Sequence, residues 1–432
     1  MTKLCIIDRF CLFFFKVHNA YANLGSLSGL SLRRSLDRAL RGEDVGLAIV
    51  GGSISKGGPF SEKGLDYVLK SYFYAIEDYW NKIIRPVTGS SLIVRDCSIG
   101  GIATDYYSYC LRSHLPDDKL TNIVLWELSA NDMKRYEEAG KGRTQPLEQF
   151  VRNVITYRAK PSLIFVNFFA NFAWNPDLAA HCRNFEDEGG DDIAKYYKIT
   201  SLSWRNMVCP ELQAGSPLFT RDRLFSEDKF HPSIQGHAQV AYLLIDYIRT
   251  EFLKNLVKMR TSNIADAVTR LQIPRSIYVP RPLFPDTFTW KPLCYTYMIT
   301  DGRQPNNTLA LDTSASGTFK SVIVRSFKIR SDKIAGMNTI DADQRVSYTI
   351  HLPPHPGGGI QPYKRLGVMS FTDDRSARIQ FDAEPTQTVQ TGKRFLEGTT
   401  VKYIAKDVRP GDHQLSIRSG NKGFLVCAIV VG

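Results

Sequence analysis

The sequence lacks the patterns that define several large classes of protein. Only eight of its 432 residues are cysteines, and none of them form a CxxC pair, so neither a disulfide scaffold nor a zinc site is indicated. No uninterrupted run of about 18 apolar residues occurs, which argues against a conventional transmembrane span. The histidines show no metal-ligand spacing. We therefore expect no metal, no cofactor and no transmembrane span.

The formal net charge is +12, and most of the basic excess lies in the C-terminal part of the chain. Residues 258–432 contain 24 Lys and Arg against 14 Asp and Glu. Such a surface attracts acidic polysaccharide, anionic membranes or nucleic acid. Because no basic run or nucleic-acid motif accompanies the excess, we expect no nucleic-acid partner. Contact with polysaccharide through this basic part stays open.

Residues 1–40 are interpreted as an N-terminal extension. Two apolar segments, Leu4–Ile7 and Cys11–Phe15, precede the tripeptide Ala20-Tyr21-Ala22, which resembles a signal-peptide cleavage site. A signal or leader of this kind predicts a secreted protein or a protein of the secretory pathway. The alternatives are a helix packed on the core and a cytoplasmic location.

Between residues 41 and 257 short apolar runs alternate with longer amphipathic stretches. This pattern is typical of βα units around a parallel sheet that is buried on both faces. We expect strands at Gly46–Val50, Ser91–Arg95, Asn122–Glu127, Ser162–Phe168 and Ile199–Leu202. We expect helices at Lys63–Ile83, Leu147–Tyr157, Ile193–Lys198 and Ile234–Lys254. Ligands of such sheets bind beyond the carboxyl ends of the strands.

The composition changes after residue 257. Prolines punctuate residues 258–290, which predicts a linker or a strap that crosses between domains. Short alternating segments fill residues 291–432 and favour an antiparallel β-sandwich. The expected strands are Lys320–Ile329, Arg345–Leu352, Leu366–Phe371, Ala377–Phe381, Thr400–Ala405, Gln414–Ile417 and Phe424–Val431.

Four short motifs, GGSIS, CSIGGIAT, ELSAND and DKFHPS, occur in this order within the α/β region. The first places Ser53 on a turn directly after a strand, where its hydroxyl can act as a nucleophile and its backbone N–H can donate to an oxyanion. Gly101 and Asn131 each follow a later strand, and they offer a backbone and a side-chain donor to the same oxyanion. These three residues form the predicted oxyanion hole.

The last motif supplies a general base. Asp228 lies three residues before His231, a spacing that lets the carboxylate hold one imidazole nitrogen while the other faces Ser53. The predicted catalytic residues are therefore Ser53, Asp228 and His231. His237 is a competing base, but its place inside the last helix favours a packing role. The turn at Ser53 lacks the GKS or GKT ending of a phosphate-binding loop, which disfavours nucleotide binding.

These motifs resemble those of the SGNH hydrolase superfamily, the GDSL esterases and lipases, over roughly residues 45–257. The order of a serine, a glycine, an asparagine and an Asp-x-x-His pair is the order of that family. The resemblance implies a flavodoxin-like three-layer α/β/α sandwich with a parallel sheet. The sequence departs from the family at Gly52, where Asp is usual, and at Ser129, where Gly is usual. The first departure alters the support beneath Ser53.

Residues 291–432 are similar to the β-sandwich modules that accompany some carbohydrate-active SGNH enzymes, with matching elements at Pro410–Leu415 and Phe424–Val431. The resemblance implies a carbohydrate-binding role for this part of the chain. We therefore expect a serine esterase that acts through an acyl-enzyme on an ester-bearing carbohydrate or another small acyl ester, with carbohydrate O-acetyl groups favoured. The alternatives are a lipase or acyltransferase with the same triad, and a non-catalytic glycan-binding protein that retains the fold.

Overall fold

The computed structural model describes most of the chain. The described residues are 20–57, 71–133, 144–170, 182–261, 279–285, 287, 292–296, 298, 300, 320–325, 333–340, 342–354, 362–371, 375–391, 399–421 and 424–432.

The chain divides into two compact units. The first, called here the α/β unit, contains residues 1–98, 117–144 and 154–282. The second, the β unit, contains residues 99–116, 145–153 and 283–432. The division follows packing rather than chain order, because two short segments from the middle of the chain belong to the β unit. The boundaries expected from the sequence, at residues 41–257, 258–290 and 291–432, stay predictions.

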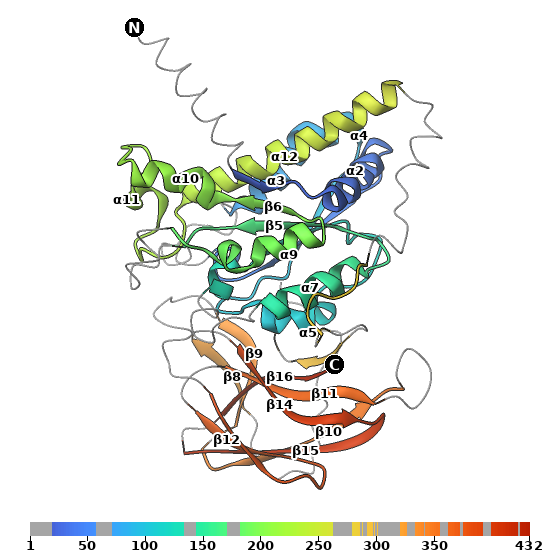
Figure 1. Ribbon diagram of the computed structural model, residues 1–432, viewed down its shortest axis with the longest axis vertical. Coiled ribbons are helices and arrows are strands. Elements are labelled where there is room, and N and C mark those ends of the chain that lie inside the picture. The colour runs from blue at the N-terminus through green and yellow to red at the C-terminus, as the bar shows by residue number, and fades with distance from the viewer. Residues whose placement is uncertain are drawn as a thin grey trace. The chain divides into compact units, whose positions relative to one another are not determined.

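One six-stranded sheet forms the centre of the α/β unit (Figure 1). Its strands, in spatial order, are β1 (Tyr21–Asn23), β6 (Thr200–Ser203), β5 (Ser162–Asn167), β4 (Ile123–Glu127), β2 (Val45–Gly51) and β3 (Leu92–Asp96). The last five are parallel in the flavodoxin-like order, and β1 is an antiparallel edge. All five strands expected here from the sequence are present, because buried parallel strands form nearly continuous apolar runs.

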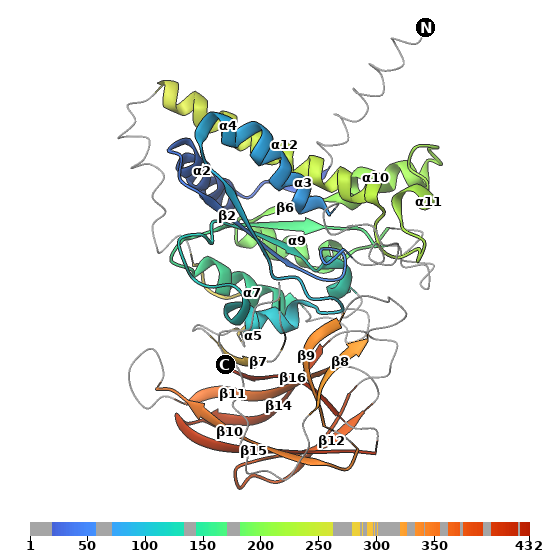
Figure 2. The ribbon, with the colours of Figure 1, turned by 180° about the vertical axis from the view of Figure 1, so that it is seen from behind.

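Helices cover both faces of this sheet. Figures 1 and 2 show α2 (Ser26–Leu40), α3 (Tyr72–Tyr79) and α12 (Ile234–Thr261) on one face and α9 (Gly190–Tyr196) on the other. The unit also contains the π-helix η3 (Trp80–Ile84), α4 (Arg85–Thr88), the 3-10 helix η4 (Phe185–Glu188), α10 (Trp204–Gln213) and α11 (Arg221–Leu224). The three layers confirm the expected α/β/α sandwich. Among the described helices, none combines the length and apolarity that a membrane crossing requires.

Residues 20–40 form β1 and α2 of the α/β unit. For these residues the structure agrees with the alternative of a helix packed on the core. The side chains of Leu32, Leu36 and Ala39 are fully buried, and the Tyr21 hydroxyl donates to Asp246 at 2.6 Å. The tripeptide that resembles a cleavage site therefore lies in and beside β1. Residues 1–19, with both apolar segments, lie outside the described part.

The β unit is an antiparallel sandwich, as expected. One sheet has the order β10 (Arg345–Leu352), β15 (Gly411–Ser419), β12 (Ser376–Phe381) and β13 (Gln387–Gln390). The other has the order β14 (Thr399–Val408), β11 (Tyr363–Phe371), β16 (Phe424–Val431), β9 (Lys333–Ile340) and β8 (Lys320–Arg325), and β7 (Leu293–Thr296) pairs with β16. Strand β16 is buried along its whole length, whereas β10 alternates between buried and more exposed residues. The core lies between the sheets.

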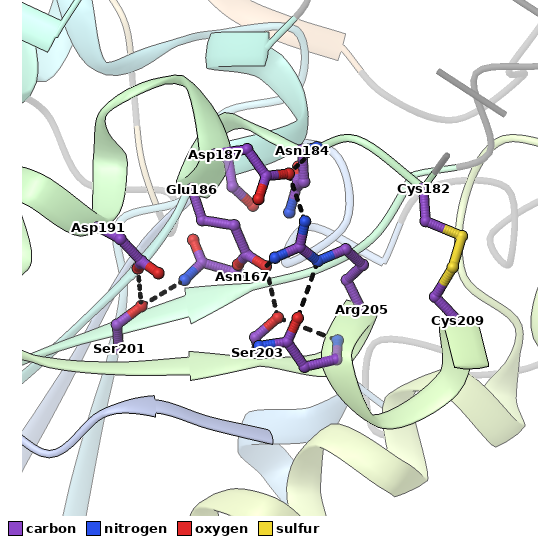
Figure 3. Close-up of polar contacts among 12 residues, drawn as sticks. Asn167, Cys182, Asn184, Glu186, Asp187, Asp191, Ser201, Ser203, Arg205 and Cys209 are labelled. Carbon is purple, nitrogen blue, oxygen red and sulfur yellow. Dashed lines mark hydrogen bonds and ion pairs between the residues drawn. A yellow bond between two sulfur atoms is a disulfide. The ribbon is translucent and has the colours of Figure 1, made fainter. Parts of the chain in front are cut away.

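Two helices from the middle of the chain belong to the β unit, wholly or mainly: α5 (Thr104–His114) and α7 (Thr144–Ile155). A disulfide links Cys110 in α5 to Cys294 in β7, and the hydroxyls of Tyr109 and Tyr403 are 2.6 Å apart. A second disulfide, Cys182–Cys209, lies in the α/β unit (Figure 3). The cysteine pattern predicted no disulfide scaffold and left individual pairs open; the two pairs found here are 184 and 27 residues apart in sequence.

The described part of the proline-rich segment, residues 279–285 and 287, is bound by a buried side chain of α7. Glu148 of α7 accepts hydrogen bonds from the backbone N–H groups of Leu283 and Phe284 at 2.5 and 3.0 Å, and from the Thr287 hydroxyl at 2.6 Å. The carboxylate is fully buried. The start of the expected linker, residues 258–261, completes α12, and residues 262–278 lie outside the described part.

Replacing Cys110 and Cys294 by Ala is expected to lower the free energy of unfolding of the β unit by about 2–5 kcal/mol, because a long closed loop no longer restricts the unfolded chain. Urea denaturation followed by circular dichroism measures this loss. The Cys182→Ala, Cys209→Ala variant is the control and should leave the β-unit transition in place. An unchanged β-unit transition in the first variant would contradict the assignment of α5 to this unit.

Candidate active site

The site lies at the carboxyl ends of β2 and β4. These neighbouring strands are the point where the strand order of the sheet reverses, which is where ligands of such sheets bind. Ser53 follows β2 by two residues, and Asn131 follows β4 by four. The loop before α12 brings His231 to Ser53 from a position 178 residues further along the chain.

Ser53, His231 and Asp228 form one chain of hydrogen bonds. Oγ of Ser53 lies 2.7 Å from Nε2 of His231, and Nδ1 of His231 lies 2.5 Å from Oδ2 of Asp228. The His231 side chain is only 9% exposed, and the Asp228 side chain is 31% exposed. The carboxylate therefore holds the ring at Nδ1, with Nε2 directed at the Ser53 hydroxyl, an arrangement in which Nε2 can accept the serine proton.

The second oxygen of Asp228 fixes the loop itself. Oδ1 accepts hydrogen bonds from the Ser226 hydroxyl at 2.7 Å and from the backbone N–H groups of Phe230 and His231 at 2.9 Å each. Burial opposes ionisation of Asp228, but the hydrogen bond and charge of His231, with these donors, hold its pKa well below the usual range. Asp228 is therefore an anion that orients His231.

The two glycines before Ser53 let the side chains of Asn131 and Ser55 lie close to the backbone of the turn. A Cβ added at Gly52 would lie 2.7 Å from Oδ1 of Asn131, and one added at Gly51 would lie 2.2 Å from Oγ of Ser55. A larger residue at position 52 would therefore displace the Asn131 side chain, and glycine lets the Asn131 amide lie beside the serine turn.

Gly101 has a backbone φ of 73°, in the left-handed region that favours glycine. Its segment, residues 99–116, belongs to the β unit, whereas Ser53 and Asn131 belong to the α/β unit. Its role as an oxyanion donor stays a prediction.

Another sequence candidate takes a packing role. His237 of α12 is 1% exposed, stacks on Tyr72 with ring centroids 6.1 Å apart, and has its pKa lowered to about 3 by burial and by the nearby His231. Among the described residues, no group of three or more His, Cys, Asp or Glu side chains is arranged to hold a metal ion.

The sequence analysis assigned no role to Glu127, the last residue of β4. Its side chain is fully buried and accepts hydrogen bonds from the turn that carries Ser53, including one from the Ser55 hydroxyl at 2.7 Å. Burial raises the pKa of Glu127 to about 8. The sequence offers one signal for Glu127: its carboxyl group directly follows the apolar run Ile123–Trp126.

Comparison with known proteins supports the fold. No family model matches the chain, and no curated protein matches it by sequence. Two solved structures of a two-domain esterase active on acetylated mannans match it at 19% and 21% identity, with TM-scores of 0.63 and 0.64. Each match covers 96% of this chain and 97% of the other, and one of the two structures was co-crystallised with mannopentaose. The chain therefore shares the fold of this two-domain esterase, which agrees with the α/β/α sandwich and the antiparallel β-sandwich described above.

The raised pKa of Glu127 predicts a specific pH dependence of stability. The folded protein keeps this proton up to about pH 8, whereas the unfolded chain releases it near pH 4.5, so this group's contribution to the free energy of unfolding falls as pH rises between these values. The decrease is about 1 kcal/mol per pH unit. Urea denaturation across this range should show a shallower slope for Glu127→Gln. Parallel slopes for the variant and the wild type would refute the assignment.

Proposed function

We propose that this protein is a serine esterase that removes acyl groups, most simply acetyl groups, from carbohydrate. The observation that carries the proposal is the hydrogen-bonded series Ser53–His231–Asp228, with distances of 2.7 and 2.5 Å. An imidazole that lies within hydrogen-bond distance of a serine hydroxyl and is held by a carboxylate is the arrangement that removes the serine proton in serine hydrolases.

In the proposed reaction His231 takes the proton of Ser53 as the serine oxygen attacks the ester carbonyl. The Ser53 backbone N–H and the Asn131 side chain stabilise the oxyanion, and Gly101 supplies a third donor in the sequence prediction. His231 then protonates the leaving alcohol, which leaves an acyl-enzyme. Water, deprotonated by His231, attacks this ester and frees Ser53. Asp228 stays ionised throughout and stabilises the imidazolium.

The fold neighbours and the charge of the β unit support the proposed substrate class. The esterase that shares this two-domain fold acts on acetylated mannans, which favours an acetylated polysaccharide here too. The basic excess in residues 258–432 supports contact between the β unit and the polysaccharide. Two disulfides support folding in an oxidising compartment, and so a secreted protein or one of the secretory pathway.

Ser53→Ala and His231→Ala are each expected to lower kcat for p-nitrophenyl acetate and for acetylated manno-oligosaccharides by about 10,000-fold or more, because each removes a member of the relay. Circular dichroism should show that both variants fold. A fluorophosphonate probe should label Ser53 in the wild type and fail to label Ser53→Ala. Full activity in either variant would overturn the proposed nucleophile or base.

Gly52→Ala is expected to lower kcat by about 100-fold, because the added methyl group displaces the Asn131 amide and so removes one oxyanion donor. The matched control is Gly29→Ala in α2, where the added methyl group meets nothing closer than 3.4 Å. Steady-state kinetics on p-nitrophenyl acetate distinguish the two variants. Equal activities would show that Asn131 does not act on the oxyanion.

A further inference from the structure

Glu127 lies directly beneath the turn that carries Ser53. In the register of the sheet Glu127 pairs with Gly51, so its side chain stands next to the end of β2. One carboxyl oxygen, Oε2, accepts hydrogen bonds from the Gly52 N–H at 3.3 Å, the Ser55 N–H at 3.1 Å and the Ser55 hydroxyl at 2.7 Å. These donors come from both sides of Ser53 in the sequence.

Further contacts fix the positions of the Ser55 hydroxyl and the Glu127 carboxyl group. The Ser55 hydroxyl lies 2.9 Å from the Tyr72 hydroxyl. A Cβ on Gly51 would lie 3.1 Å from Oε2 of Glu127, so the approach of the carboxyl group depends on glycine at this position. Both hydroxyl-bearing residues are buried.

We infer that Glu127 is the positioning residue of the nucleophile: it holds the Gly52–Ser55 turn so that the Ser53 hydroxyl meets His231 and the Ser53 N–H faces the oxyanion. This inference rests on the proposed function. Glu127 touches neither substrate nor His231 in this role, and it acts through the backbone of the turn.

The ionisation of the carboxyl group fits this role. Its other oxygen, Oε1, is buried and has no hydrogen-bond partner within the described part of the chain. Burial raises the pKa of Glu127 to about 8, so the group is mainly neutral at pH 7. A neutral acceptor supports the turn without placing a negative charge near the oxyanion that forms beside Ser53.

Glu186 provides a matched control. It is another buried carboxyl group of the α/β unit, but its partners are the Ser203 hydroxyl at 2.5 Å and the Arg205 guanidinium at 2.6 Å (Figure 3). Figure 3 shows this network at the ends of β5 and β6, with Asp187 also directed at Arg205. Replacing Glu186 tests the loss of a buried carboxyl group without changing the serine turn.

The experiment compares Glu127→Gln, Glu127→Leu, Ser55→Ala and Glu186→Leu with the full-length wild type. Steady-state kinetics on p-nitrophenyl acetate are combined with hydrogen exchange at the Gly52 and Ser55 amides, and kcat is expressed per folded molecule. Glu127→Leu should lower kcat by about 100-fold with KM within about threefold, and should lose protection at the Ser55 amide. The Gly52 amide should keep its protection, because it also donates to the backbone carbonyl of residue 127 at 3.2 Å. Glu127→Gln, which keeps an acceptor, should stay within about fivefold of the wild type.

Ser55→Ala removes one of the three donors and should lower kcat by about tenfold, which keeps the test decisive if Glu127→Leu does not fold. Glu186→Leu should lose stability and keep its kcat. Wild-type kcat in Glu127→Leu or Ser55→Ala, or equal losses in Glu127→Leu and Glu186→Leu, would overturn the inference. If the wild type itself hydrolyses no ester, the proposed function fails, and protection of the Ser55 amide in Glu127→Leu still decides whether Glu127 holds the turn.

Discussion

The hydrogen bond between Ser53 and His231 is the interaction on which the rest of the site depends, since it joins two segments 178 residues apart in sequence. Each side of this bond is fixed separately. On one side, β2 ends in a turn whose backbone is held by Glu127 from the neighbouring strand. On the other side, Asp228 orders the loop and the imidazole together. A rigid sheet and a short loop before a long helix are enough to hold the contact.

The two carboxyl groups beside this bond have opposite properties. Asp228 receives several donors and has its pKa held low, so in the proposed reaction it would stabilise a positive charge on His231. Glu127 is fully buried with no cation against it among the described contacts, and its pKa is raised to about 8. One therefore serves as a charge and the other as a neutral acceptor. Asp228 and Glu127 have nearly the same chemistry, and their different surroundings give them these different functions.

Much of this architecture could be predicted from the sequence because the signals are local. The parallel strands are apolar runs, and the Asp228–His231 pair lies within one loop. Other features depend on contacts that no local pattern reveals. Helix α2 was only an alternative in the sequence analysis, because the apolar segments and the cleavage-like tripeptide before it also fit a leader. The Cys110–Cys294 pair spans 184 residues, so no local pattern reveals it. Glu127 was overlooked because its role depends on the register between β2 and β4.

The central claim is that Ser53 carries the acyl group during turnover. The most direct test is a rapid acid quench of the enzyme during hydrolysis of an acetyl ester, followed by mass spectrometry of its peptides. The account predicts acetylation of Ser53 in the wild type and none at this position in His231→Ala. Turnover with the acetyl group on a different residue, or with no covalent adduct under conditions where deacylation limits the rate, would contradict it.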